Sequence, residues 1–126
     1  MRAIITGAAR GIGRPIALRL ARDGQQRGGA RLVLANLDGD ELQSLAAEVA
    51  ALGALALPCP CDLADPDSAT LLARTAAAFG GLDAVVSNAG VALRGPLVDY
   101  SVEHWDRTFA VHVRAPGCWP APATPN

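Results

Sequence analysis

A glycine-rich turn stands between a short apolar run and a helical run near the start of the sequence. Residues 6–13 read TGAARGIG and lie between the apolar run 2–5 and the helical run 16–22. Glycine has no Cβ atom, so the three glycines of the turn allow backbone angles and close approaches that other residues forbid. An apolar run followed by such a turn and a helical run predicts a strand that turns tightly into a helix, which is an α/β unit. The N-terminus of that helix can accept an anion such as a diphosphate. The alternative is a turn that only packs the helix on the strand.

Apolar runs alternate with helical patterns four times along the chain. The apolar runs predict strands at 2–6, 31–35, 54–57 and 83–87, and the helical patterns predict helices at about 12–23, 39–52, 66–79 and 101–115. The strand runs lack a clean polar alternation, which indicates that both faces of each strand are covered. We therefore expect an α/β fold with a doubly wound parallel sheet and helices on either side.

Two of the predicted helices carry end signals. Asp65 stands before a proline and is expected to cap the helix predicted at 66–79, because a proline loses no amide bond in the first turn. Gly53 follows the apolar stripe of the helix predicted at 39–52 and is expected to end that helix.

The composition excludes several classes of protein. A chain of 126 residues with 51% hydrophobic residues is enough for one domain with a moderate core. Its net charge of -1 offers no basic field for nucleic acid. No run of about 18 apolar residues could span a membrane. The chain opens directly into a predicted strand without a leader segment, so we expect a cytoplasmic location.

The three cysteines do not suggest a disulfide framework. Their number is odd, and Cys59 and Cys61 are separated by a single proline, so free thiols are expected. The two could be grouped with His104 and His112 as metal ligands, because alternation along a strand puts both sulfurs on one side. Their spacing differs from the Cys-x-x-Cys of zinc sites, and buried thiols commonly act as small hydrophobic groups. No metal site is therefore predicted.

Four segments occur in the order and spacing of one known family. They are the glycine turn at 6–13, Cys61-Asp62-Leu63 after the third predicted strand, Asn88-Ala89-Gly90 after the fourth, and Glu103-His104-Trp105-Asp106 at the start of the next helix. Over residues 1–115 the chain resembles the N-terminal half of the short-chain dehydrogenase/reductases. The resemblance implies a Rossmann-like sheet with strand order 3-2-1-4, truncated after about four β-α units, and one dinucleotide-binding domain at 1–115.

The resemblance also implies where a dinucleotide cofactor would bind. In the family the glycine turn binds the cofactor diphosphate. The matching residues here are Thr6, Gly7, Arg10, Gly11, Ile12 and Gly13. The aspartate at the Asp62 position, next to Leu63, contacts the adenine, and the segment Asn88, Ala89 and Gly90 lies along the adenosine ribose while it braces the sheet. Asp62 suits this role because it follows a buried strand at its carboxyl end, where open α/β sheets bind ligands; the alternative is an ordinary turn residue.

The residue at the end of the second predicted strand bears on the choice of cofactor. In the family an acidic residue there normally accepts hydrogen bonds from the ribose and favours NAD, whereas this chain has Asn36. An amide can bond the ribose hydroxyls without repelling a 2′-phosphate, and the Arg10 guanidinium could hold such a phosphate. The cofactor is therefore expected to be NAD or NADP, and the sequence favours NADP.

The proton-transfer residues of the family do not occur in this chain. Family members use a Tyr-x-x-x-Lys pair and a serine on segments from the fifth strand onwards. This chain contains no lysine, and its one tyrosine, Tyr100, precedes the helix predicted at 101–115. A fourth active-site residue of the family, an asparagine, is replaced by His112, which could relay protons or be a polar residue on a half-buried helix. We therefore expect an NAD(P)-dependent oxidoreductase by resemblance that is inactive alone.

Two alternatives remain open, a non-catalytic nucleotide-binding or dimerisation module and a truncated fragment without function. The segment 116–126 is rich in proline and is expected to be irregular; it could bind an aromatic groove or result from a reading-frame shift. Without a fifth strand, the strand at 82–88 would lie at an apolar edge of the sheet. Self-association through that edge is therefore expected.

Overall fold

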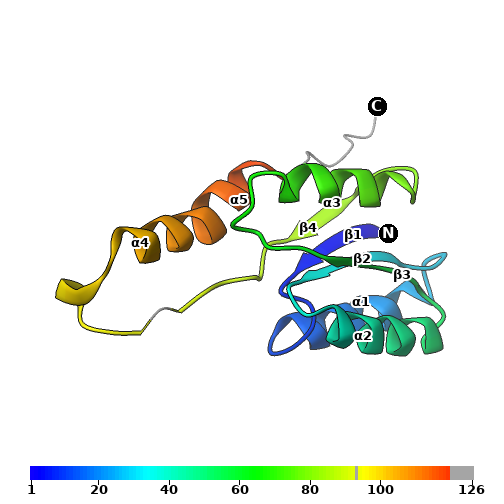
Figure 1. Cartoon of the computed structure of the whole chain (residues 1–126). Coiled ribbons are helices and arrows are strands. Elements are labelled where there is room, and N and C mark those ends of the chain that lie inside the picture. The colour runs from blue at the N-terminus through cyan, green and yellow to red at the C-terminus, as the bar shows by residue number, and fades with distance from the viewer. Residues whose placement is uncertain (93, 120–126) are drawn as a thin grey trace.

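Four parallel strands form one sheet in the order β3-β2-β1-β4, as the computed structural model of residues 1–92 and 94–119 shows (Figure 1). The strands are β1 (Arg2–Thr6), β2 (Arg31–Asn36), β3 (Leu55–Pro60) and β4 (Ala84–Val86). In register, Ile4 of β1 lies opposite Val33 of β2 on one side and Val85 of β4 on the other. The predicted α/β class and strand order are confirmed.

Helices cover both faces of this sheet, which makes it doubly wound. Helices α1 (Gly13–Gly24) and α2 (Gly39–Ala51) lie on one face, and α3 (Ser68–Ala77) lies on the other (Figure 1). After β4 the chain forms a short 3-10 turn η1 (Leu97–Asp99), helix α4 (Val102–Phe109), a π-helical segment η2 (Ala110–Arg114) and a short helix α5 (Ala115–Gly117). The α4 end of this arm extends away from the sheet.

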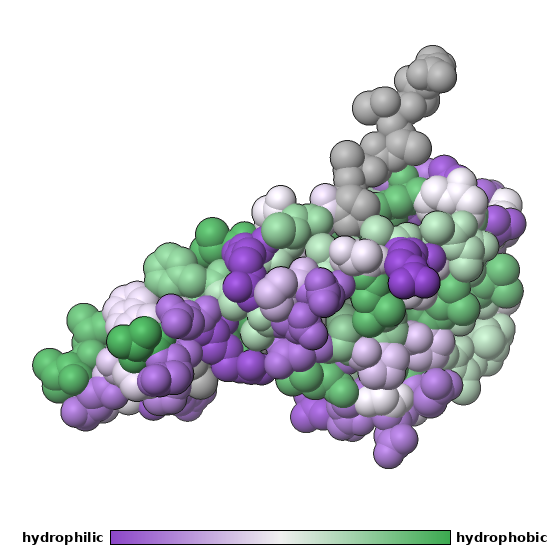
Figure 2. All heavy atoms as spheres, turned by 45° about the horizontal axis from the view of Figure 1, so that its top comes forward, coloured by the Kyte–Doolittle hydropathy of each residue, from purple (hydrophilic) through white to green (hydrophobic). Residues whose placement is uncertain are grey.

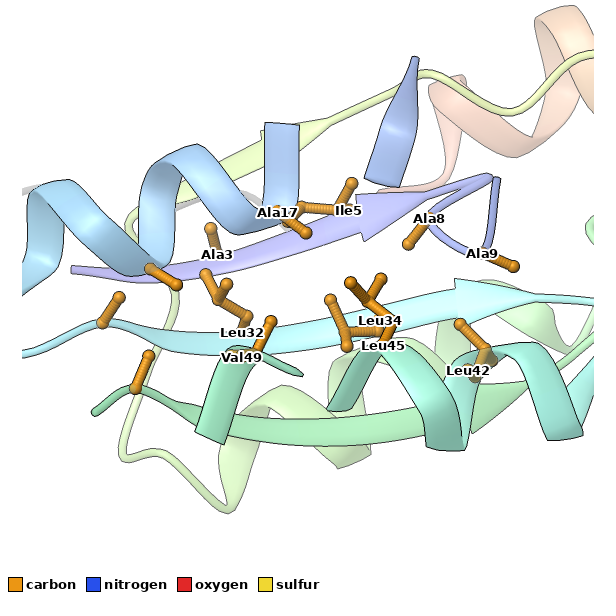
Figure 3. Close-up of a cluster of buried hydrophobic side chains, with 13 residues drawn as sticks. Ala3, Ile5, Ala8, Ala9, Ala17, Leu32, Leu34, Leu42, Leu45 and Val49 are labelled. Atoms are coloured by element: carbon orange, nitrogen blue, oxygen red, sulfur yellow. The ribbon is translucent and has the colours of Figure 1, made fainter. Parts of the chain in front are cut away.

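Two apolar clusters hold the layers together. Figure 3 shows the first, in which Ile5 of β1 lies beside Ala17 of α1, and Leu34 of β2 lies beside Leu45 of α2. The apolar positions of α2, Leu42, Leu45 and Val49, are fully buried because their three- and four-residue spacing places them on one side of the helix. Each such side chain stabilises the fold by about 1.5–3 kcal/mol. The second cluster lies on the opposite face, beneath α3.

The ends of α2 follow the expected chemistry, whereas the start of α3 does not. Asp38 caps α2 by accepting a hydrogen bond from the amide of Glu41 at 3.1 Å, and Gly53 follows the helix with a φ of 77°. Asp65 was expected to cap a helix at 66–79, and this was wrong. Its carboxylate instead accepts from the amide of Asp67 in a turn, and the helix begins at Ser68.

Three other element boundaries differ from the predicted ones. Strand β3 continues to Pro60, beyond the end predicted at 57. The alternating prolines and cysteines at 58–60 hid this continuation in the sequence, although they still pair with β2. The edge strand β4 has three residues, fewer than the predicted 83–87. Helical structure continues past 115, because Pro116 lies in the first turn of α5, where no amide donor is needed. The rest of the proline-rich segment, 120–126, lies outside the described residues.

Large apolar side chains are exposed on the arm that carries α4. Val98 is 91% exposed, Val102 69% and Phe109 54%. Hydrophobic atoms accordingly come to the surface of the arm in Figure 2. The ring of Trp105 lies between those of Tyr100 and Phe109 within this arm, with centroid distances of 5.6 and 5.8 Å.

Candidate functional site

Two adjoining hollows lie at the carboxyl ends of the strands. The lining residues of the first hollow are Gly7, Ala35, Asn36, Leu37, Cys61, Asp62, Leu63, Ala89, Gly90, Val91 and Val111. The lining residues of the second hollow are Gly7, Arg10, Ile12, Asn36, Asn88, Ala89 and Gly90. Every residue predicted to bind a cofactor therefore lines one hollow or the other, except Thr6, Gly11 and Gly13.

The glycine turn is shaped by backbone angles and close packing. Gly7 and Gly11 have φ values of 63° and 58°, which side-chain-bearing residues rarely adopt. A Cβ atom on Gly13 would lie 2.2 Å from the carbonyl oxygen of Gly7, so only glycine lets α1 start this close to the turn. A Cβ atom on Gly11 would meet no atom within 4 Å, so the backbone there is open to a ligand.

Thr6 and Asn88 support the glycine turn from behind. The Thr6 hydroxyl, fully buried, accepts hydrogen bonds from the backbone amides of Asn88 and Ala89, both at 3.0 Å. The Asn88 side-chain amide donates to the carbonyl oxygens of Thr6 and Gly7, at 3.1 and 3.2 Å. These bonds join the end of β1 to the segment after β4, so both residues fix the path of the turn, and Asn88 also lines the second hollow.

The N-terminus of α1 is free to receive an anion. No side chain caps this end, and its first turn contains no acidic residue. The first amides of a helix lack partners within the helix and carry a partial positive charge. Ile12, 73% exposed, and Arg10 stand beside this end on the rim of the second hollow. The Arg10 guanidinium lies 3.0 Å from the Asp38 carboxylate, and both side chains are exposed.

Asp62 forms the acidic wall of the first hollow. Its carboxylate accepts a hydrogen bond from the amide of Ala64 at 2.9 Å and pairs with the Arg107 guanidinium at 3.1 Å. The Ala64 amide first, and Arg107 to a lesser degree, hold the pKa of Asp62 below its ordinary value. Asp62 is therefore an ionised acceptor at neutral pH. The sequence carries no signal for Arg107, because the two residues are 45 positions apart and no pattern links them.

His112 is held against the segment that follows β4. Its Nε2 atom lies 3.0 Å from the backbone nitrogen and 2.9 Å from the carbonyl oxygen of Val91, and the tautomer decides which of the two it bonds. A Cβ atom on Gly90 would lie 2.7 Å from the ring, so glycine is needed for this contact. His112 therefore contacts Val91, which lines the first hollow, but the His112 side chain itself lines neither hollow.

Residues 1–92 and 94–119 contain neither a cluster of metal-ligating side chains nor a membrane-spanning helix. In this part of the chain, no three or more histidine, cysteine or acidic side chains are grouped so that they could hold a metal ion. The helices in the same residues are too short or too polar for any of them to cross a membrane.

Several known proteins are similar in sequence to this chain over most of its length. The short chain dehydrogenase family matches residues 1–117. Short-chain dehydrogenase/reductase eriH of Hericium erinaceus is 41% identical over 117 residues, which are 89% of this chain and 44% of that protein. D-beta-hydroxybutyrate dehydrogenase of Rhizobium meliloti is 40% identical over 114 residues, which are 88% of this chain and 42% of that protein. The chain thus spans less than half the length of these relatives.

Solved structures give the same answer for the fold. A short chain dehydrogenase from Burkholderia cenocepacia, in complex with NADP, superposes with a TM-score of 0.84 and 39% identity, over 93% of this chain and 46% of that one. A metagenomic short-chain oxidoreductase, also in complex with NADP, gives a TM-score of 0.79 and 37% identity, over 94% of this chain and 52% of that one. With its strand order, its glycine turn and these matches, the chain belongs to the short-chain dehydrogenase/reductase family.

Proposed function

We propose that this chain binds a nicotinamide dinucleotide in the two hollows and forms the cofactor-binding portion of an NAD(P)-dependent oxidoreductase. The observation that carries the proposal is the open backbone at Gly11 beside the uncapped N-terminus of α1. Such amides suit a diphosphate, and the adjoining hollow offers an acceptor, Asp62, and the apolar side chain of Leu63 for an adenine. When bound, the nicotinamide would supply the hydride acceptor or donor.

The residues around the hollows would divide the work of binding. The glycine turn and the start of α1 would hold the diphosphate, and Asn36, which lines both hollows, would bond the adenosine ribose. Thr6 and Asn88 would act indirectly, since their hydrogen bonds fix the path of the turn. Two relatives in complex with NADP support a dinucleotide as the ligand.

NADP is the dinucleotide that the charges favour. Asn36 carries no charge that would repel a 2′-phosphate, and Arg10 is exposed on the rim of the second hollow. Arg10 is also paired with Asp38, whose carboxylate would compete with the 2′-phosphate for the Arg10 guanidinium. The variant Asp38→Asn tests this balance, because asparagine caps a helix as well as aspartate does but has no charge. We expect it to tighten NADPH binding and leave NADH binding unchanged, whereas Arg10→Ala should weaken NADPH binding by roughly tenfold or more.

These 126 residues alone are proposed to bind without turnover. The chain contains no lysine, and Tyr100 lies next to α4 in the arm, with its ring centroid 5.6 Å from that of Trp105. The chain therefore does not contain the Tyr-x-x-x-Lys pair that the family resemblance implies. Loss of positioned acid-base catalysis typically lowers a rate by about 100- to 10,000-fold. This observation also supports the second candidate, a non-catalytic dinucleotide-binding module.

Thermal unfolding in the presence of dinucleotides tests the proposal. A ligand at about 100 times its Kd stabilises the folded state by about 2.7 kcal/mol, so NADPH should raise the melting temperature by several degrees. Carbonyl reduction followed through NADPH absorbance should then show no turnover above the buffer rate. A folded protein that is not stabilised by millimolar NADPH or NADH would contradict dinucleotide binding, and measurable turnover would contradict inactivity.

A further inference from the structure

Two thiols, Cys59 and Cys61, lie one residue apart along the chain, and Cys61 lines the first hollow. Cys59, in β3, is 4% exposed and belongs to the apolar cluster beneath α3, with its sulfur 3.7 Å from the Thr75 hydroxyl. Cys61, half-buried, packs against the same cluster and also lines the first hollow. Both side chains therefore lie on one side of the chain, one behind the hollow and the other at its surface, separated only by Pro60.

The two thiols act on each other electrostatically. A hydrogen bond from the Cys61 thiol is the main reason why the pKa of Cys59 is lowered, to about 6, and burial opposes this shift. The same contact with Cys59, followed by burial and the charges of Asp62 and Asp65, raises the pKa of Cys61. The two thiols therefore lose their protons in two separate steps, and the first proton leaves more readily than that of an ordinary thiol.

We propose that Cys59 and Cys61 form a reversible disulfide that reshapes the first hollow. The partner in this chemistry is a low-molecular-weight disulfide of the glutathione type. Cys61, which is half-buried and lines the hollow, is the sulfur that such a reagent can reach, and Cys59 is the sulfur that can complete the bond from behind. The site is a redox modification site in the wall of the hollow, and only its effect on dinucleotide affinity rests on the proposed function.

The exchange proceeds in two balanced steps. The Cys61 thiol passes its proton to the Cys59 thiolate, and the resulting Cys61 thiolate attacks one sulfur of the external disulfide, which leaves a mixed disulfide on Cys61 and expels one thiolate. That thiolate takes the proton from Cys59 and departs as a thiol. The Cys59 thiolate then attacks the Cys61 sulfur and expels the second thiolate, which takes a proton from solvent. The protein loses two electrons and two protons, and the external disulfide gains them. An external dithiol reverses both steps.

Closing this bond strains the edge of the hollow. Alternate residues of an extended strand have Cα atoms about 6.6 Å apart, from a rise of about 3.3 Å per residue. A disulfide prefers about 5.5–6 Å between its Cα atoms and tolerates up to about 6.8 Å. The chain must therefore shorten between Cys59 and Cys61. That shortening pulls on the hydrogen bond from the Cys61 amide to the Asn36 carbonyl, now 2.9 Å long, and on the neighbouring Asp62.

The test begins with the Cys118→Ser variant, which removes the exposed third thiol. We expect oxidised glutathione to remove both remaining thiols without staying attached, and peptide mapping to find the bond between positions 59 and 61. Adding Cys59→Ala to this background should trap glutathione on Cys61, because no second sulfur can displace it. Adding Cys61→Ala should leave the buried Cys59 unmodified.

Two readouts report the effect on the hollow. Amide exchange at Cys61 should accelerate by about tenfold in the oxidised protein, because the bond to Asn36 is weakened. The affinity for NADPH should fall by about tenfold, within the usual range for coupled sites, and return with dithiothreitol. Glutathione that stays on Cys61 in the Cys118→Ser protein, or a bond that changes neither readout, would overturn the proposal. If the reduced protein binds no dinucleotide, the proposed function fails, and the mapping and exchange data still decide the disulfide.

Discussion

Arg107 of α4 holds the carboxylate of Asp62, with 3.1 Å between Nη1 and Oδ2. The pair joins the arm that projects from the sheet to the end of β3, at the wall of the first hollow. Both side chains are more than one third exposed, so the pair itself stabilises the fold by about 1 kcal/mol or less. Its main effect is on position, because it keeps an ionised acceptor at the edge of the hollow.

Asp62→Asn should weaken dinucleotide binding by about tenfold, because an amide is a poorer acceptor than a carboxylate for an exocyclic amine. The side-chain oxygen can still accept from the Ala64 amide, so the fold should be retained. Asp67→Asn is a matched control, since the Asp67 side chain makes no capping bond at the start of α3. Isothermal titration of both variants with NADPH measures the effect. Equal affinities of the two variants for NADPH would contradict a role of Asp62 in dinucleotide binding.

Gly11→Ala should abolish dinucleotide binding at a modest cost in stability. Alanine is strained at a φ of 58°, which should lower the free energy of unfolding by about 1–2 kcal/mol. Gly28→Ala is the control, because Gly28 also has a positive φ, 81°, and open space around its Cα atom, but lies far from the hollows along the chain. Urea unfolding should rank the two variants alike, and titration with NADPH should separate them. Binding by Gly11→Ala as tight as by Gly28→Ala would contradict a diphosphate on this turn.

Thr6→Val should destabilise the protein by about 1–3 kcal/mol, although the side chains have nearly the same shape. The variant removes the hydroxyl that accepts from the amides of Asn88 and Ala89 in a partly buried position, and only the Asn88 amide keeps a second acceptor, the Val86 carbonyl at 3.1 Å. Thr6→Ser keeps the hydroxyl and loses one methyl group, which should cost about 0.8 kcal/mol. Chemical denaturation followed by circular dichroism compares the two. A valine variant at least as stable as the serine variant would contradict the role of the hydroxyl.

The sequence predicted the layers of this fold better than the contacts of its site. The short apolar runs gave the parallel strands, and the family resemblance gave their order, which periodicity alone does not specify. The glycine turn was recognisable because Gly7 and Gly11 need angles that few residues adopt. The pair between Asp62 and Arg107 was not predictable, because it depends on how the arm lies against the sheet.

Local signals failed where two neighbours offered equivalent chemistry. Asp65 and Asp67 both suit a helix start, and only the tertiary structure decides that α3 begins at Ser68. The π-helical segment η2 also had no signal in the sequence. It contains His112, whose contact with the backbone of Val91 cannot be seen from sequence spacing.

Asp83 makes the stability depend on pH in a defined range. Its carboxylate accepts from the guanidinium and the backbone amide of Arg2, both at 2.6 Å, and these bonds lower its pKa to about 2. A depressed pKa adds stability above the unfolded value of about 3.9, and this stability is lost as the pH falls through the folded value. The difference in unfolding free energy between the wild type and Asp83→Asn should therefore be constant above about pH 5 and shrink from about pH 4 to pH 2.

Arg2→Gln provides the control for this pH dependence. It removes the guanidinium that holds Asp83 but keeps the backbone amide bond, so most of the dependence between pH 4 and pH 2 should disappear. Urea unfolding at a series of pH values measures all three proteins. An unchanged pH profile in Arg2→Gln would show that another group is responsible.

The edge of β4 should make the protein self-associate. No strand among residues 1–92 and 94–119 pairs with the outer side of Ala84–Val86, and unpaired strand amides can bond a second chain. Sedimentation velocity should show a concentration-dependent increase in mass at micromolar concentrations, with slower amide exchange at 84–86 in the associated form. Phe109→Gln, which reduces the exposed apolar surface of α4, should leave the association unchanged. A monomer at all concentrations would contradict pairing at this edge, and loss of association in Phe109→Gln would assign it to α4.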